Sequence, residues 1–311
     1  MSPIRPPALI VLSLATCLGF TSTVSSAILL ADPFAGGGTT PGPGQYQSDP
    51  ASTNGVNNDS IAGQGPTLPG FSGSTWSGGN FISSIYGQIA DGGLHYEDGF
   101  GNKVNRYGTP HHLRFARGIN ASVTRNTSRG TLLNGPMTNY TPGATGIYVA
   151  ALMRYDAVGT QGVLRLIQGG SRALTMQING AGELLVGSNF TFNAGPKNMG
   201  SLTPGQTHLV VLHFFENNRL EVWVNPTDLA NNPAPDFSGA DPGPGYVGSN
   251  GSFGLETINI RFPGGNAGDV FEVDEIRVAT SFIEAVNIPE PTSLAFLALG
   301  ALAAMRRGRM A

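Results

Sequence analysis

The feature that most constrains the fold is a series of short segments in which apolar and polar residues alternate, separated by turn residues. In 174–178 the apolar side chains recur at every second position, and glycines then turn the chain into 183–186. This pattern predicts a β-hairpin. The continuous apolar run 209–215 predicts a strand buried on both faces, and the alternating segment 220–225 predicts its partner. Because no long segment has a helical period, the sequence predicts an all-β sandwich.

The last predicted strand changes phase in its middle. Phe271 and Val273 share one face of a strand, whereas Ile276 and Val278 fall on the opposite parity. One extra residue at positions 274–275 returns all four to the core. We therefore predict a β-bulge there.

The composition excludes a nucleic-acid partner. The 311 residues have a formal net charge of −3, and only 12% of them are charged. Such a surface has no basic field that would attract phosphates. The segment 28–287 suits one large sandwich better than two domains, since single β-sandwiches reach roughly 200–250 residues.

The N-terminal residues 1–27 have the pattern of a secretory signal peptide. Arg5 precedes an apolar run that ends near Phe20, and 25–27 are small residues before a cleavage site. We expect the mature chain to begin near Ile28; the alternative is a retained anchor or a first core helix. The only cysteine, Cys17, lies inside the apolar run, so the mature chain is expected to depend on a large apolar core rather than on disulfides.

The C-terminal tail combines an extended motif, an apolar block and a basic end. The prolines of the motif keep the chain extended and accessible to a processing enzyme. The apolar block, 294–305, predicts a short transmembrane helix. A helix of about a dozen residues covers roughly 18 Å of the ~30 Å hydrocarbon core, so we expect a transient anchor. The sorting motif is Pro289, Glu290 and Pro291, and the basic stop is Arg306, Arg307 and Arg309.

Together these blocks, at 288–311, resemble the PEP-CTERM tail of bacterial export substrates. The resemblance implies that an exosortase-type membrane protease cleaves the chain near the Pro-Glu-Pro motif, after export through the Sec translocon and cleavage by signal peptidase. It also implies transient anchoring in the inner membrane, and a final location at the cell envelope, the surface or outside the cell. The alternative is an ordinary single-span anchor.

The body of the chain resembles concanavalin A-like or laminin-G-like jelly rolls of planctomycete-type secreted proteins that carry this tail. The resemblance implies a two-sheet antiparallel jelly-roll sandwich over 28–287, in which the first and last strands pair. The segments that carry it are 31–34, 76–79, 146–152, 220–226 and 273–278.

The same fold hosts glycoside hydrolases, whose catalytic carboxylates follow each other along one strand about 5 Å apart. Glu272 and Asp274 begin such a pattern, but Ile276 and Arg277 occupy both positions at which the third carboxylate could stand. Glu275 directly follows Asp274 and projects to the other side unless the predicted bulge redirects it. The sequence therefore predicts a protein that is not an enzyme, and a divergent glycoside hydrolase is the second alternative.

Histidines and aspartates offer only weak candidates for metal binding. Neighbours in a strand point to opposite faces, so we expect His111 and His112 to lie in a surface loop rather than in a metal site. His213 lies between apolar residues and is expected to be a core or edge histidine. No cofactor is predicted, although the laminin-G-like resemblance implies calcium candidates near strand ends. These are Asp32, Asp269 and Asp274, with turn and surface roles as the alternative.

The leading functional prediction is an exported, non-catalytic protein with a structural or adhesive role, within extracellular polysaccharide. The first alternative is a carbohydrate-binding, lectin-like module, which needs exposed aromatic rings that stack on sugars. Trp223 is the candidate for this contact because it faces away from Leu220, Val222 and Val224 in an alternating strand. If the faces are reversed, Trp223 is a core residue.

Overall fold

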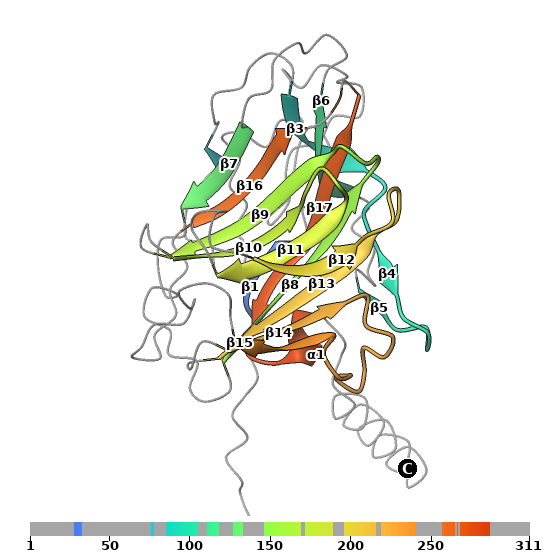
Figure 1. Ribbon diagram of the computed structural model, residues 1–311, viewed down its shortest axis with the longest axis vertical. Helices are drawn as coiled ribbons and strands as arrows, with labels where there is room; N and C mark the ends of the chain where they lie inside the picture. The colour runs from blue at the N-terminus through green and yellow to red at the C-terminus, as the bar shows by residue number, and fades with distance from the viewer. Residues whose placement is uncertain are drawn as a thin grey trace, which may run out of the picture.

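In the computed structural model, the chain forms two large antiparallel sheets that pack face to face (Figure 1). It describes residues 28–32, 76–77, 85–104, 111–117, 127–132, 146–168, 172–188, 196–215, 219–240, 257–264, 266 and 268–286. Within these ranges the regular structure is strand, apart from one short helix, α1 (Phe282–Ala285). The predicted all-β antiparallel sandwich is therefore confirmed.

One sheet has eight strands, in the order β15-β14-β13-β8-β17-β6-β3, with β1 paired to β17 beyond the end of β6. Ile28 lies opposite Ala279, and Asp32 lies opposite Ile276. The first and last strands therefore pair, as expected. The strands are β1 (Ile28–Asp32), β3 (Ile85–Asp91), β6 (His111–Arg117), β8 (Ile147–Tyr155), β13 (His208–Phe214), β14 (Arg219–Val224), β15 (Phe237–Ala240) and β17 (Val270–Ala279).

The other large sheet has seven strands, in the order β12-β11-β10-β9-β16-β7-β2. They are β2 (Trp76–Ser77), β7 (Thr127–Leu132), β9 (Gln161–Gln168), β10 (Arg172–Ile178), β11 (Glu183–Ser188), β12 (Lys197–Ser201) and β16 (Thr257–Gly264). A separate hairpin pairs β4 (Tyr96–Glu97) with β5 (Lys103–Val104).

The chain visits the two sheets in the order of a jelly roll. Consecutive strands such as β8 and β9, or β16 and β17, lie in different sheets. As a result, each strand of the run β8-β17-β6 in one sheet is adjacent in sequence to the corresponding strand of the run β9-β16-β7 in the other sheet. Strands distant in sequence thus become neighbours, which is the predicted jelly-roll arrangement.

The main core fills the space between the sheets with side chains from alternate positions of each strand. The predicted hairpin is β10–β11, in which Leu174 lies opposite Ser188 and Ile178 opposite Leu184. All seven residues of β13 are buried, which confirms the predicted buried strand for 209–214, whereas Phe215 follows the strand and is half-buried. Alternate residues of β16 enter the same core. They are Ile258, Ile260 and Phe262.

The predicted bulge in the last strand is present. Along β17 the register with β8 shifts between Asp274 and Arg277, and Glu275 adopts a positive φ of 50°. The extra residue lets apolar side chains on both sides of the bulge face the same core. These are Phe271, Val273, Ile276 and Val278, all with 0% exposure.

The expectation of a surface loop at His111 and His112 is wrong, because both residues lie in β6. Leu113 and Phe115 of this strand enter the main core. His112 is 3% exposed and faces Glu272, 3.0 Å away. The carboxylate of Glu272 satisfies Nε2 of this buried ring, whereas Nδ1 has no hydrogen-bond partner among the described residues.

Candidate functional site

The outer face of the eight-stranded sheet carries a second apolar cluster, which the sequence pattern did not reveal. Strand alternation places Tyr148, Val211 and Trp223 on this face, whereas their neighbours in sequence enter the main core. The β4–β5 hairpin, a loop after β14 and α1 cover the cluster. Its buried members are Leu94, Val104, Ala150, Leu152, Leu209, Val211, Trp223, Leu229, Ala279, Phe282, Ala285 and Val286.

Asp98 fixes the hairpin to the loop that covers the cluster. Its carboxylate accepts hydrogen bonds from the backbone N–H groups of Phe100 and Asn102 within the hairpin, both at 2.8 Å. It also accepts one from Leu229 in the loop after β14, at 2.7 Å. Burial alone would raise the pKa of Asp98, but these hydrogen bonds outweigh burial and lower the pKa. The carboxylate therefore stays ionised and keeps the cover in place.

Trp223 points to the outer face, as its strand parity predicted, but the ring is only 2% exposed. Its Nε1–H donates a hydrogen bond to the carbonyl oxygen of Pro233 at 2.6 Å. The ring centroid lies 5.2 Å from that of Phe282 and 6.1 Å from that of Tyr148. The faces of the strand are therefore not reversed, since Leu220 and Val222 enter the main core. Trp223 is nevertheless buried in the outer cluster, where it packs beneath other rings instead of meeting solvent.

An open groove lies above this aromatic cluster, where β8 and β13 meet the start of α1. Its volume is about 420 Å³. One wall comes from the sheet and the other from the segment that leads into the helix. The residues that line it are Tyr148, His213, Phe215, Asn232, Thr280, Ser281, Phe282 and Ile283. We call this feature the aromatic groove.

The rings of the aromatic groove are held in a fixed stack. His213 lies parallel to Tyr148, with centroids 3.8 Å apart and planes at 9°, and its ring is 3.9 Å from that of Phe215. Nδ1 of His213 lies 3.0 Å from Oε2 of Glu221, which orients the imidazole. His213 is therefore the buried histidine that the sequence predicted, and its role is to position the rings on either side.

The aromatic groove combines apolar walls with hydroxyl and amide side chains. Burial, and then the negative charge of Glu221, raise the pKa of Tyr148 to about 12, so its hydroxyl stays protonated. Asn232 and Ser281 add further polar side chains to the apolar walls. A pyranose ring has the matching chemistry, because it offers apolar C–H faces to aromatic rings and hydroxyls to polar groups. The alternation along β8 indicates that Tyr148 faces outward, so the sequence holds a signal for this residue. Asn232 and Phe282 belong to segments whose position against the sheet cannot be predicted from the sequence.

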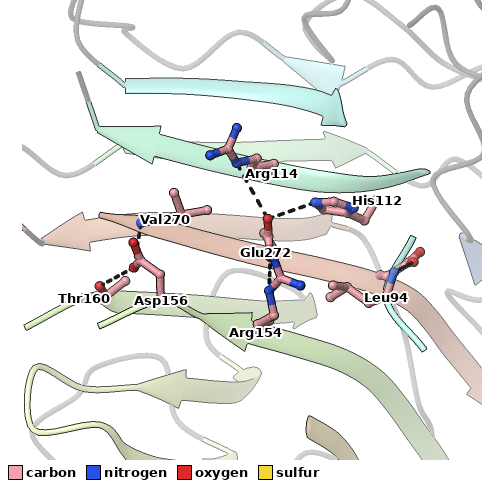
Figure 2. A network of polar contacts seen from close by, with 9 residues as sticks. Leu94, His112, Arg114, Arg154, Asp156, Thr160, Val270 and Glu272 are labelled. Carbon is pink, nitrogen blue, oxygen red and sulfur yellow. Dashed lines mark hydrogen bonds and ion pairs between the residues drawn. The ribbon is translucent and has the colours of Figure 1, made fainter. Parts of the chain in front are cut away.

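A second polar site surrounds Glu272 on the same face of the sheet (Figure 2). Glu272 lies between Arg154 of β8 and Arg114 of β6, which are its partners in register. Oε2 is 2.6 Å from Nε of Arg154, while Oε1 is 3.6 Å from Nε of Arg114 and 3.0 Å from Nε2 of His112. The Glu272 side chain is 5% exposed, whereas the two arginines are 39% and 38% exposed. We call these four residues the Glu272 cluster.

The Glu272 cluster keeps its carboxylate ionised. Burial alone would raise the pKa of Glu272, but the hydrogen bond and charge of His112, followed by the charges of Arg154 and Arg114, outweigh burial and lower the pKa. An ionised carboxylate held by three donors is a poor proton donor. This arrangement differs from that of a glycosidase acid, whose pKa is raised.

The bulge sets the direction of the carboxylates that follow Glu272. Asp274 is 0% exposed and accepts backbone hydrogen bonds from Leu94 at 3.0 Å and from Glu275 at 2.8 Å. Burial, and then the charges of Glu275 and Asp32, raise the pKa of Asp274 well above its ordinary range. Glu275 itself pairs with Arg277, with Oε2 2.5 Å from Nη2. Each carboxylate of the segment thus has partners within the fold.

The structure brings together two of the three calcium candidates. Asp32 of β1 lies next to Asp274, both with 0% exposure, whereas Asp269 lies near the other end of β17 and accepts a hydrogen bond from Asn266 at 2.5 Å. Among the described residues no group of three histidine, cysteine, aspartate or glutamate side chains is arranged to hold a metal ion. Calcium binding at Asp32, Asp269 and Asp274 stays a prediction.

The sorting residues lie outside the described ranges. They are Pro289, Glu290 and Pro291 of the motif, Arg306, Arg307 and Arg309 of the basic stop, and the predicted short helix at 294–305. The predicted signal peptide at 1–27 lies outside them as well. In the part of the chain that the structure describes, no helix is both long and apolar enough to cross a membrane.

Solved structures with a similar fold include proteins of several kinds. A sialidase shares 10% identity over 67% of this chain, with a TM-score of 0.39, and this chain spans only 17% of its length. The globular domain of T. cruzi calreticulin shares 12% identity over 76% of this chain and 95% of that domain, with a TM-score of 0.41. A glycosyl hydrolase family protein from Mycobacterium fortuitum shares 14% identity over 81% and 99% of the two chains, with a TM-score of 0.41. These TM-scores lie below 0.5, so no shared activity follows from them.

Sequence comparison identifies the tail. No curated protein matches this chain. Residues 287–309, however, match the PEP-CTERM protein-sorting motif, and the match covers the predicted motif, apolar block and basic stop. The predicted sorting by an exosortase-type system is thereby confirmed. The chain carries a PEP-CTERM sorting tail, and it is therefore an exported protein that is anchored transiently in the membrane before its release to the cell surface.

Proposed function

We propose that this exported protein is a non-catalytic adhesin of the cell surface or extracellular matrix, which binds neutral polysaccharide in the aromatic groove. The observation that carries the proposal is the groove of about 420 Å³, which is lined both by stacked rings and by hydroxyl and amide side chains. Aromatic faces combined with a few polar groups are the chemistry that recognises a sugar ring. The adhesive role and the lectin-like role predicted from the sequence would thus both use the aromatic groove.

Two features support a role without catalysis. The carboxylate of Glu272 is ionised and held by two arginines and a histidine, and that of Asp274 is buried under backbone donors. Neither has the environment of a general acid facing a substrate. Incubation of the protein with soluble polysaccharides should therefore release no reducing sugar, and steady release would support the hydrolase alternative.

The remaining partners belong to the same proposal. Delivery begins with the Sec translocon and signal peptidase, which act on 1–27, and polysaccharide outside the cell is the adhesive partner. A planctomycete-type source stays a prediction of the sequence.

The groove is tested by replacing Phe215, which is half-buried and lies 3.9 Å from the His213 ring. Phe215→Ala removes one aromatic wall and leaves the strands intact. We expect binding of the full chain to a responsive polysaccharide, measured by affinity electrophoresis across a panel of neutral glucans, mannans and galactans, to weaken roughly tenfold, or about 1.4 kcal/mol.

The matched control is Phe100→Ala, which removes a ring that is 75% exposed but lies in the turn of the β4–β5 hairpin, outside the groove. Its binding should equal that of the unmodified chain. Equal losses for both variants would assign binding to exposed apolar surface in general, and retention by Phe215→Ala would remove the groove from the proposal.

A further inference from the structure

The Glu272 cluster reaches solvent through its two arginines. The side chains of Glu272 and His112 are 5% and 4% exposed, whereas those of Arg154 and Arg114 are 39% and 38% exposed. Strand alternation places all four on the outer face of the eight-stranded sheet, because their neighbours in sequence enter the main core. The buried carboxylate therefore lies at the base of the cluster, and the two arginine side chains form its surface.

Glu272 cannot satisfy the donors of both arginines. Two guanidinium groups carry about ten N–H donors, whereas one carboxylate has about four lone-pair sites, which it also shares with His112. The closest atom of each arginine to the carboxylate is Nε, at 2.6 Å for Arg154 and 3.6 Å for Arg114. In Figure 2, the terminal nitrogens of Arg114 point away from Glu272. Since no other described residue accepts a hydrogen bond from either arginine, donors remain on both for a ligand.

The Glu272 cluster is a positive site on a chain whose formal net charge is −3. Its two arginines outnumber its one ionised carboxylate. Asp156 follows Arg154 by two residues on the same face of β8, but its Oδ1 accepts hydrogen bonds from the backbone N–H of Val270 at 2.8 Å and from the hydroxyl of Thr160 at 3.0 Å (Figure 2). The composition excludes an extended basic field, but one anionic group needs only a local pair of guanidinium groups.

Glu272 holds the two arginines in position before a ligand arrives. Arg114 of β6 and Arg154 of β8 lie opposite Glu272 on its two sides, so the sheet fixes their spacing. Adjacent strands are about 4.8 Å apart, which places the two arginine backbones roughly 10 Å from each other. The carboxylate between them orients both side chains. A planar guanidinium that is already oriented loses less conformational freedom when it binds a carboxylate or a sulfate group.

The Glu272 cluster is separate from the aromatic groove. Tyr148 of the groove and Arg154 of the cluster lie on the same face of β8, six residues apart, which corresponds to roughly 20 Å along the strand. Leu152, between them on this face, is buried with residues of the β4–β5 hairpin in the outer cluster. No residue that lines the groove belongs to the Glu272 cluster. The two sites can therefore be tested independently.

We propose that Arg114 and Arg154 form an anion site, which binds the charged groups of an acidic polysaccharide, either uronate carboxylates or sulfate esters. Paired N–H donors of a guanidinium match two oxygens of such a group. Because the chain is exported to the cell surface, the polymer is an extracellular one. Both arginines are more than a third exposed, so salt should weaken the contact strongly. This inference does not rest on the aromatic groove.

Matched polymers test the ligand. The full chain is passed over immobilised polygalacturonate and over the same polymer after methyl esterification, which removes the charge and keeps the sugars. Dextran sulfate and dextran form the second pair, so the two pairs distinguish carboxylate from sulfate as the source of the anion. We expect roughly tenfold tighter binding to the charged member of at least one pair, and loss of this preference in ~0.5 M salt. Equal binding within both pairs would overturn the inference.

Matched variants test the site. Arg114→Gln removes only the longer contact with Glu272, so the chain should stay folded while its binding to the preferred charged polymer weakens roughly fivefold. Lys103→Gln removes the same charge from the β4–β5 hairpin, where the side chain is 48% exposed and pairs with Glu97. Binding by this control should equal that of the unmodified chain. Equal losses for both variants would assign binding to overall charge and overturn the site.

The outcomes separate this inference from the proposed function. The polymer pairs use the unmodified chain, so they remain decisive even if a variant unfolds. Failure of every neutral polysaccharide to bind would contradict the proposed function of the groove, whereas a preference for a charged polymer would still support the anion site. Neutral binding without any such preference would leave the groove and remove the anion site.

Discussion

At the scale of single residues, Glu272 is a buried carboxylate that is stabilised by its neighbours. Its strongest contact is with Arg154 at 2.6 Å, whereas Arg114 is 3.6 Å away. Both arginines are more than a third exposed, so water screens part of the attraction. The Glu272 cluster therefore contributes less to the free energy of unfolding than a fully buried ion network would.

We predict that Glu272→Gln lowers the free energy of unfolding by about 2 kcal/mol at pH 7, because three donors lose their ionised acceptor. A folded-state pKa that is lowered from the ordinary 4.5 stabilises the fold above that pH, and the effect disappears as the pH falls through the folded-state pKa. The difference between the two proteins in urea titrations should thus be full at pH 7 and shrink as the pH falls below 4.5.

Arg114→Gln is the matched control, since it removes only the long contact. It should cost about 0.5 kcal/mol. A cost that is the same at pH 7 and pH 3 for Glu272→Gln would indicate packing rather than charge.

At the scale of elements, the bulge in β17 decides which side chains of the last strand enter the core. Glu275 is the extra residue, with a φ of 50° in the left-handed region, and its side chain pairs with Arg277. The phase change in the sequence predicted the bulge. It could not predict that Glu275 would be 4% exposed and have its charge partner two residues later in the same strand.

We predict that deletion of Glu275 keeps the cooperative fold. The deletion removes the extra residue, so β17 alternates plainly and Ile276 and Val278 still face the core with Phe271 and Val273. Glu275→Gly keeps the bulge and relieves the positive φ, and it should cost about 2–3 kcal/mol through the lost partner of Arg277. The measurement is thermal unfolding followed by circular dichroism. A deletion variant that does not unfold cooperatively would contradict the assignment of Glu275 as the extra residue of the bulge.

At the scale of the whole molecule, the first and last strands close the sandwich. β1 occupies the edge of β17 beyond β6, and Asp32 is completely buried beside Asp274. Removal of β1 would expose backbone donors and acceptors of a central strand and would expose apolar surface around Leu29.

A chain that begins at residue 33 should therefore lose roughly 3–5 kcal/mol of unfolding free energy and aggregate more readily than one that begins at Ile28. Urea unfolding and light scattering of the two chains measure this difference. Equal stability would show that β1 is dispensable for the sandwich.

Local sequence determined the elements and the destination of the protein. Alternation in 174–178, the apolar run of β13 and the phase change in β17 each predicted structure, because side-chain parity within a strand is a local property. The tail was readable for a similar reason, since its motif, apolar block and basic end are contiguous in the sequence.

Only the tertiary structure decided the site. The parity of Trp223 was predictable, but its burial depends on Phe282, Leu229 and the β4–β5 hairpin, which are distant in sequence. The aromatic groove likewise combines Tyr148 and His213 with Ser281 and Phe282, and the Glu272 cluster combines three strands. Such sites form where the jelly roll brings separate segments into register, and neither composition nor spacing along the chain encodes that register.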